Sequence, residues 1–325
     1  MHPAFSVIFL TTLIGVGQGL FLALFTGHLY AVIKVVPMQA DPQAFYGLGS
    51  LLALAFMAGG LAASFFHLGR PARGWRAVAM WRTSWLSREV IVLPAFMGLL
   101  ALYGLIRYLD WNPALFTLGP IQVDLALVVG TLASALAFVL FICTGMIYAC
   151  IKFLQEWASP LTVVNYTLLG SASGFTLATA FSALYAPELV RFYGVWAVII
   201  TAAALVTRAG SLRRNARITH KSNLQTAIGV RHGQIVQKAQ GAMGGSVNTR
   251  DFFHSKSPQF MRAIQWGFLV LVFPVPLLLL AAGMGSSAVA VLAAAFLVQY
   301  AGLIAERWFF FAQANHPQNL YYQTV

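Results

Sequence analysis

A histidine and a glutamate stand at the two ends of one polar stretch, which separates two long apolar runs. His67 follows the apolar run 46–66, and Glu89 precedes the run 90–106. A histidine titrates near neutral pH, and a carboxylate can relay protons to water. Ionisable groups at membrane depth are rare and usually functional. The pair is therefore suited to protonating or deprotonating a quinone headgroup at one membrane face.

The stretch between them supplies further polar groups, so the candidate cofactor-binding residues are His67, Arg70, Arg73, Ser87 and Glu89. The two arginines could hold Glu89 ionised or bind quinone oxygens. A structural alternative stays open for each end of the stretch. Glu89 would then stabilise the first turn of a helix that has Ser87 as its N-cap. His67 would be an interfacial histidine bonded to a backbone carbonyl.

The elements that position these residues follow from composition. The chain is 59% hydrophobic and 9% charged, with a mean hydropathy of +0.77, whereas soluble domains are about 25% charged. Several apolar runs exceed the roughly 18 residues that mark a membrane-spanning helix. Alternation with a period of two residues, typical of a β-barrel, is absent. The sequence predicts an all-α polytopic membrane protein, with 1–325 as a single integral membrane domain.

We predict eight transmembrane helices, at residues 5–33, 46–66, 90–106, 125–151, 161–184, 192–207, 263–282 and 286–305. The first helix contains small residues where a neighbouring helix can approach closely, namely Gly15, Gly17, Gly19 and Gly27. Gln18 in the same helix is expected to form a hydrogen bond between helices.

The distribution of basic residues predicts the orientation. With eight helices, both termini and the connections 67–89, 152–160 and 208–262 share one side of the membrane. That side carries seventeen of the twenty Lys and Arg residues, and the other side carries only Lys34, Arg107 and Arg191. The positive-inside rule then places both termini in the cytoplasm of a bacterium, with the protein in its inner membrane.

The connection 208–262 is long for a link between two neighbouring helices, and connections of this length are usually functional or disordered. Its first part is basic, and residues 241–250 are rich in Gly, Ser and Asn. One interpretation is contact with lipid headgroups followed by a disordered loop. We favour a cytoplasmic docking platform for a soluble subunit, because Gly244-Gly245 permits close approach and 251–254 (Asp-Phe-Phe-His) supplies an anchor. The connection 67–89 lies on the same side and is also rich in Arg and Trp.

Metal sites are not expected in this chain. Cys143 and Cys150 lie seven residues apart and form no Cys-x-x-Cys pair, so the sequence contains no motif for an iron–sulfur or zinc site. His28 and His67 fall at opposite ends of the membrane spans and cannot clamp one haem. There is also no phosphate-binding glycine loop and no serine nucleophile motif. We assign no catalytic residue and expect no nucleic-acid partner.

Six segments together resemble the dimethyl sulfoxide reductase anchor-subunit family: residues 67–71, 73–76, 83–89, 2–6, 306–312 and 316–322. The resemblance implies an eight-helix, haem-free subunit that exchanges electrons between a quinone, either ubiquinone or menaquinone, and a four-cluster iron–sulfur subunit. That subunit in turn serves a molybdopterin catalytic subunit. In the family, a histidine and a glutamate that match His67 and Glu89 are implicated at the quinone site.

Within the family, residues 2–6, the loop 243–250 and the C-terminal end are most similar to anchors of cytoplasmic sulfite dehydrogenases. Those anchors pass electrons from sulfite to quinone, and a cytoplasmic docking face fits them. An anchor of an S- or N-oxide reductase, which takes electrons from quinol, is the first alternative. A secondary transporter is another, although no internal repeat is evident. In a purely structural anchor, His67 and Glu89 would serve as helix caps only.

Overall fold

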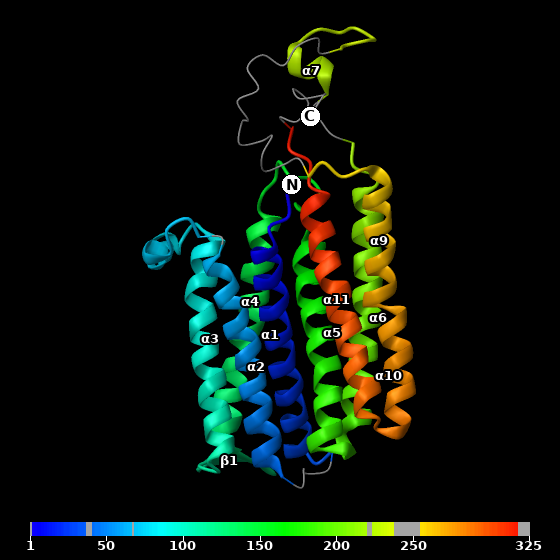
Figure 1. Cartoon of the computed structure of the whole chain (residues 1–325). Helices are drawn as coiled ribbons and strands as arrows, with labels where there is room; N and C mark the ends of the chain where they lie inside the picture. Colours follow the sequence, from blue (N-terminus) through cyan, green and yellow to red (C-terminus); the bar gives the residue numbers. More distant parts are fainter. Residues whose placement is uncertain (1, 37–40, 67, 220–222, 237–253, 318–325) are drawn as a thin grey trace.

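The structure is a computed structural model that describes residues 2–36, 41–66, 68–219, 223–236 and 254–317. Long helices stand side by side in one bundle (Figure 1). They are α1 (Phe5–Val32), α2 (Pro42–Phe65), α3 (Trp85–Tyr108), α4 (Leu125–Ala149), α5 (Pro160–Tyr185), α6 (Val190–Asn215), α9 (Pro258–Val272), α10 (Pro274–Ser286) and α11 (Val289–Ala312). With α9 and α10 taken as one span, the described chain has eight helices that are long and apolar enough to cross a membrane. The predicted helical class and span count are confirmed.

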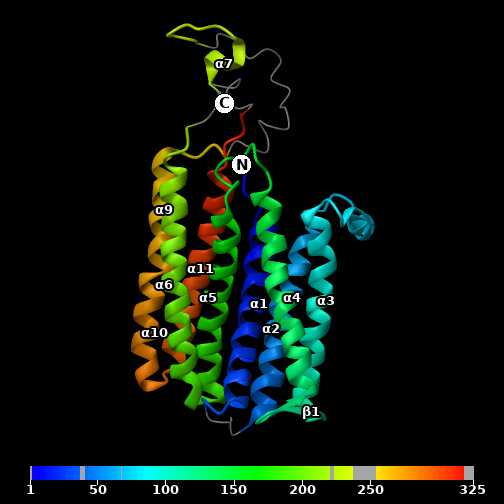
Figure 2. The same ribbon diagram turned by 180° about the vertical axis from the view of Figure 1, so that it is seen from behind.

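The two ends of the bundle differ. At one end α1 begins and α11 ends, and we name this the terminal end (Figures 1 and 2). The opposite end carries an antiparallel hairpin of β1 (Ala114–Leu118) and β2 (Ile121–Asp124), with Leu118 paired to Ile121. We name this the hairpin end. The all-α prediction did not include the hairpin, whose turn uses Gly119 at a φ of +58°.

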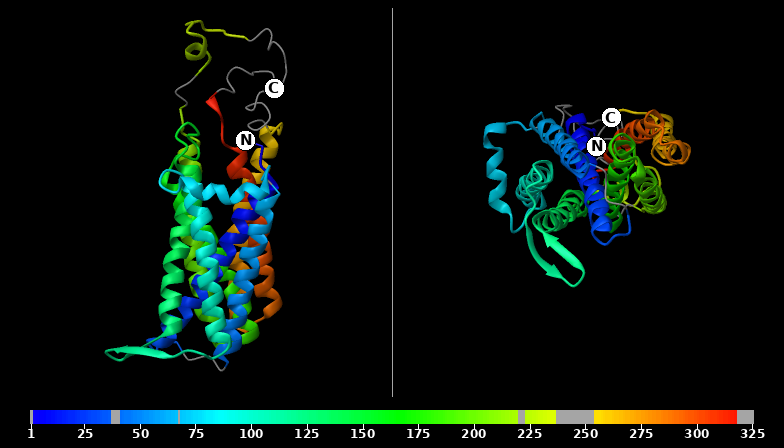
Figure 3. Two further views of the ribbon diagram at one scale, coloured as in Figure 1. Left: turned by 90° about the vertical axis from the view of Figure 1, so that its left-hand side faces the viewer. Right: turned by 90° about the horizontal axis from the view of Figure 1, so that it is seen from below.

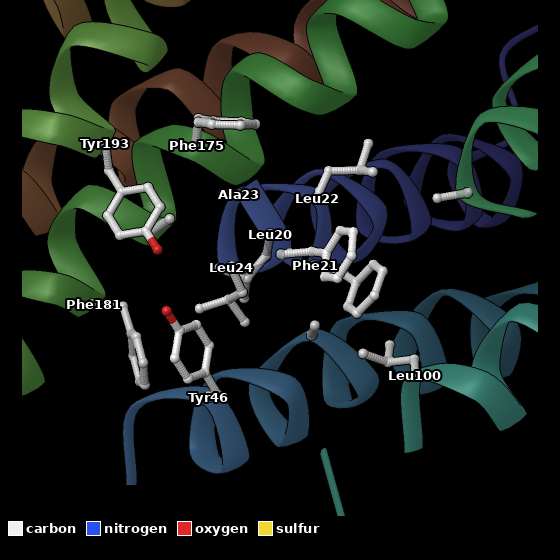
Figure 4. Packing of buried hydrophobic residues seen from close by; sticks show 14 of the residues in the cluster. Leu20, Phe21, Leu22, Ala23, Leu24, Tyr46, Leu100, Phe175, Phe181 and Tyr193 are labelled. Carbon is white, nitrogen blue, oxygen red and sulfur yellow. The ribbon is translucent and has the colours of Figure 1, made fainter. Parts of the chain in front are cut away.

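Helix α1 lies in the middle of the bundle and contacts α2, α4, α5 and α11. A Cβ added to Gly174 of α5 would lie 2.0 Å from the carbonyl carbon of Gly19, so only glycine permits this approach. Gln18 Nε2 donates a hydrogen bond to the Ala137 carbonyl of α4 at 2.9 Å. Both predictions are confirmed. Figure 4 shows α1 side chains such as Phe21 packed in the hydrophobic core.

The seventh span is broken, whereas the sequence predicted one continuous helix over 263–282. Helix α9 ends at Val272 and α10 begins at Pro274. Because Pro276 has no N–H, the Val272 carbonyl loses its helical partner. Gln299 Nε2 donates to that carbonyl at 3.3 Å and lies 3.3 Å from Thr201 Oγ1. A buried amide side chain thus satisfies a backbone group that lipid could not.

The predicted loop 208–262 is shorter than expected at both ends. Helix α6 continues to Asn215, and α9 begins at Pro258. Between them the structure describes a short helix, α7 (Leu224–Ile228), beyond the terminal end of the bundle (Figure 1). The glycine-rich loop 241–250 and residues 251–253 of the predicted docking anchor lie outside the described residues.

Candidate functional site

The polar connection between α2 and α3 contains a 3-10 helix, η1 (Pro71–Met80), which lies beside the bundle near its terminal end (Figure 3). Trp75 and Trp81 are 71% and 52% exposed, and each ring has an arginine guanidinium near it. Exposed Trp and Arg side chains are typical of the membrane–water interface. Helix η1 is therefore suited to lie at the headgroup layer beside the bundle.

The start of α3 is fixed by Ser84 and Arg88. Ser84 Oγ accepts a hydrogen bond from the Ser87 amide at 3.3 Å, so Ser84 is the N-cap and the expectation for Ser87 was wrong. Arg88 donates to the carbonyls of Trp81 at 3.0 Å and Arg82 at 2.9 Å, which ties the end of the connection to the helix. Because α3 begins five residues earlier than predicted, Glu89 lies beyond the first helical turn.

Glu89 is buried inside the bundle, with 9% of its surface exposed. Its Oε1 accepts a hydrogen bond from Thr144 Oγ1 of α4. No acidic residue lies in the first turn of α3, so the capping interpretation of Glu89 is wrong. Among the described residues, neither Arg70 nor Arg73 forms an ion pair with it. Glu89 is a buried carboxylate held by a neutral hydroxyl.

A cavity of about 470 Å³ lies on one side of Glu89, and we name it the outer cavity. It is enclosed by η1, the terminal ends of α2 and α3, and Leu10 of α1. Arg70, Arg73 and Glu89 supply its charged groups. Its apolar wall includes Leu61, Phe65, Leu68, Trp75, Leu86 and Leu93. The volume falls in the range of sites for small organic ligands, and the few polar groups suffice to orient one.

The structure thus brings together three of the five predicted residues: Arg70, Arg73 and Glu89 border the outer cavity. Ser87 is buried in the first turn of α3 and does not border it. His67 lies outside the described residues, so its role stays a prediction. Its near neighbours in the chain, Leu68 and Arg70, line the cavity.

A second, much smaller cavity of about 30 Å³ also borders Glu89, and we name it the inner cavity. Helices α1, α4, α5 and α11 enclose it. Its polar lining consists of Thr11, Thr12, Gln18, Glu89, Thr144, Tyr166, Ser173 and Arg307. Glu89 and Leu10 border both cavities. Sequence reasoning missed Thr144, since one threonine in an apolar helix is a weak signal.

A buried ion cluster lies next to the inner cavity. Glu306 Oε1 lies 2.8 Å from Arg208 Nε, and its Oε2 lies 2.6 Å from Arg307 Nε. All three side chains are at most 5% exposed. The sequence prediction ended the last span at 305 and began the loop at 208, so it wrongly counted both arginines as loop charges. The basic excess at this end of the bundle persists without them.

Among the described residues, no three His, Cys, Asp or Glu side chains gather as a metal site. Cys143 is buried and Cys150 is exposed, and both are free thiols. His28 lies toward the hairpin end of α1, where its Nδ1 is 3.1 Å from the Tyr103 hydroxyl. His28, one of the two histidines considered as haem ligands, therefore already has a hydrogen-bond partner in the core.

Eight apolar helices, with charged groups gathered on a cavity at one end, define a polytopic membrane protein with an internal cavity. The model of the DMSO reductase anchor subunit family matches residues 1–322. A sulfite dehydrogenase subunit of Allochromatium vinosum is 59% identical over 328 residues, which cover 100% of both chains. The chain therefore belongs to the DMSO reductase anchor subunit family, whose members are membrane anchors of oxidoreductase complexes. The resemblance found in the sequence is confirmed.

Proposed function

We propose that this chain is the quinone-reactive anchor of a molybdopterin oxidoreductase complex, and that it passes electrons from sulfite oxidation to quinone. The outer cavity carries the proposal, because Arg70, Arg73 and Glu89 meet there beside an apolar wall. The 59% identity to a sulfite dehydrogenase subunit supports sulfite as the electron source. An S- or N-oxide reductase anchor, which shares the family, is the alternative.

The outer cavity fits a quinone headgroup in size and chemistry. A bound quinone supplies two-electron redox chemistry coupled to two protons. Arg70 and Arg73 are hydrogen-bond donors suited to the two quinone oxygens. Glu89 exchanges a proton with one oxygen, while Thr144 holds its carboxylate in place. His67, three residues before Arg70 in the chain, exchanges the other proton.

Electron transfer requires that the quinone lie close to the electron-carrying partner. The outer cavity lies at the terminal end, where η1 exposes Arg73, Trp75 and Arg76. We therefore place the partners, an iron–sulfur subunit and a molybdopterin subunit, on this end. The excess of Lys and Arg favours the cytoplasm for it.

The orientation can be tested with a reporter that is active only in the periplasm. It should be silent when fused after Val325 or within 221–238, and active within 37–43. The reverse pattern would move the partner subunits to the outer face and favour an exported reductase.

The quinone proposal is tested by Glu89→Gln, which keeps the shape of the side chain but cannot exchange the proton. Quinone-coupled turnover should fall on the order of a hundredfold or more, as when a general acid–base group is lost. Activity with a dye that takes electrons directly from the soluble subunits should persist. Glu188→Gln is the matched control, because Glu188 is an exposed residue of the short helix η2 (Pro187–Leu189) at the hairpin end. Normal quinone kinetics in an assembled Glu89→Gln complex would reject the proposal.

A further inference from the structure

Glu89 borders two cavities of very different size, and the quinone proposal uses only the outer one. The inner cavity, about 30 Å³, is far too small for a quinone. It has room for about one or two water molecules. A small cavity binds water when polar groups surround it and stays empty when its wall is apolar. The polar groups on the wall of the inner cavity therefore favour water as its occupant.

Five neutral polar side chains on this wall already have partners: Thr11, Thr12, Gln18, Thr144 and Ser173. Gln18 donates to the Ala137 carbonyl at 2.9 Å, and Ser173 donates to the Gly170 carbonyl at 2.9 Å. Arg307 differs from them. It is 4% exposed, and its Nη1 finds no hydrogen-bond partner among the described residues. A buried, unsatisfied guanidinium nitrogen is costly, and a water molecule would satisfy it.

The charges next to the inner cavity also favour a negative charge on its wall. Arg208 and Arg307 share one counter-ion, Glu306. The ion cluster therefore has one excess positive charge. Glu89 is the acidic residue that lines the inner cavity with Arg307. A negative charge on Glu89 would balance the cluster across the cavity, whereas buried charges without partners are strongly unfavourable.

We propose that the inner cavity is a water-binding site in which water bonded to Arg307 Nη1 donates a second hydrogen bond to Glu89. The proposal rests on the proposed function and extends it. When the O–H bond of Glu89 breaks and its proton passes to a quinone oxygen, the carboxylate left behind has two donors, Thr144 and the water. The Glu89 carboxylate also faces the excess positive charge of the ion cluster. Arg307 is thus a positioning residue for Glu89 and does not itself touch the quinone.

Glycine positions allow the water to be displaced without disturbing any polar group. A Cβ added to Gly15, which lines the inner cavity, would meet only Gly170 Cα, at an ordinary 3.4 Å. Gly15→Ala should therefore fill the cavity and leave the helices in place. Gly59→Ala is the matched control, because a Cβ there would meet only Leu13 Cδ1 at 3.7 Å, away from the cavity.

The water is detected directly by X-ray radiolytic labelling of the assembled complex, which modifies side chains next to bound water. Tyr166 lines the inner cavity, and Tyr103 is also buried but lies at the hairpin end. Tyr166 should be labelled far more than Tyr103. The label on Tyr166 should be lost in Gly15→Ala and kept in Gly59→Ala. Equal labelling of the two tyrosines in the unmodified protein would overturn the water site.

The functional part is tested in the same variants. Gly15→Ala should slow quinone-coupled turnover about tenfold, as expected for one lost hydrogen bond to a charged group, while dye-coupled activity stays unchanged. Gly59→Ala should match the unmodified complex in both assays. Normal quinone turnover in Gly15→Ala, with Glu89→Gln still slow, would reject the water but keep the proposed function. Normal turnover in Glu89→Gln would instead reject the proposed function.

Discussion

Two buried glutamates at the terminal end of the bundle have opposite surroundings. Glu306 is 0% exposed and lies between the guanidinium groups of Arg208 and Arg307. Glu89 has the hydroxyl of Thr144 as its partner and borders a cavity of about 470 Å³. The first carboxylate is neutralised by fixed charges, whereas the second has no such counter-charge beside it and borders a cavity. Access to a cavity, and not burial alone, distinguishes the two carboxylates, and it is the reason that the proposed proton exchange is assigned to Glu89.

The hairpin end extends the comparison. His28 bonds to Tyr103, and the Arg107 guanidinium lies 4.7 Å from the centre of the Tyr46 ring. Figure 4 shows Tyr46 among the packed core side chains. A groove of about 400 Å³ lies nearby between α2 and α3, but its lining contains no charged residue and does not include His28. His28 and Arg107 lie at the same end of the bundle as this groove, yet neither of them lines it.

The largest expected effect on stability comes from Glu306→Gln. The variant leaves two buried guanidinium groups without a counter-charge, and breaking a buried ion pair costs about 3–5 kcal/mol. The amount of folded anchor in the membrane should fall sharply, and much further than in Glu89→Gln, because Glu306 contacts both arginines and Glu89 contacts neither. Quantitative immunoblots and thermal unfolding of the two variants measure this difference in stability. A Glu306→Gln variant that accumulates normally but turns over quinone slowly would reverse the roles of the two glutamates.

The smallest expected effect comes from Tyr103→Phe at the hairpin end. The change removes one neutral hydrogen bond to His28, worth about 1 kcal/mol. The melting temperature of the anchor should drop slightly, and quinone-coupled turnover should stay normal. If turnover falls as far as in Glu89→Gln, the hairpin end takes part in the reaction and the comparison fails.

The sequence allowed prediction of the eight spans, because hydropathy and helix length decide them. It also allowed prediction that Arg70, Arg73 and Glu89 converge, because one short connection carries all three. Arg208, Glu306 and Arg307 were misplaced, since apolar runs end at charged residues, whereas ion pairs between helices let those charges enter the bundle. Thr144 could not be predicted, because its bond to Glu89 depends on how α3 packs against α4.

The location of the quinone is the central claim, and photolabelling tests it most directly. The intact complex is exposed to a photoreactive quinone analogue, and the labelled peptides are identified by mass spectrometry with and without excess quinone. We expect quinone-protected labels in peptides that cover 61–77 and 86–93, because these peptides contain most of the residues that line the outer cavity. Protected labels confined to 47–54 and 100–108, which line the groove at the hairpin end, would contradict the account.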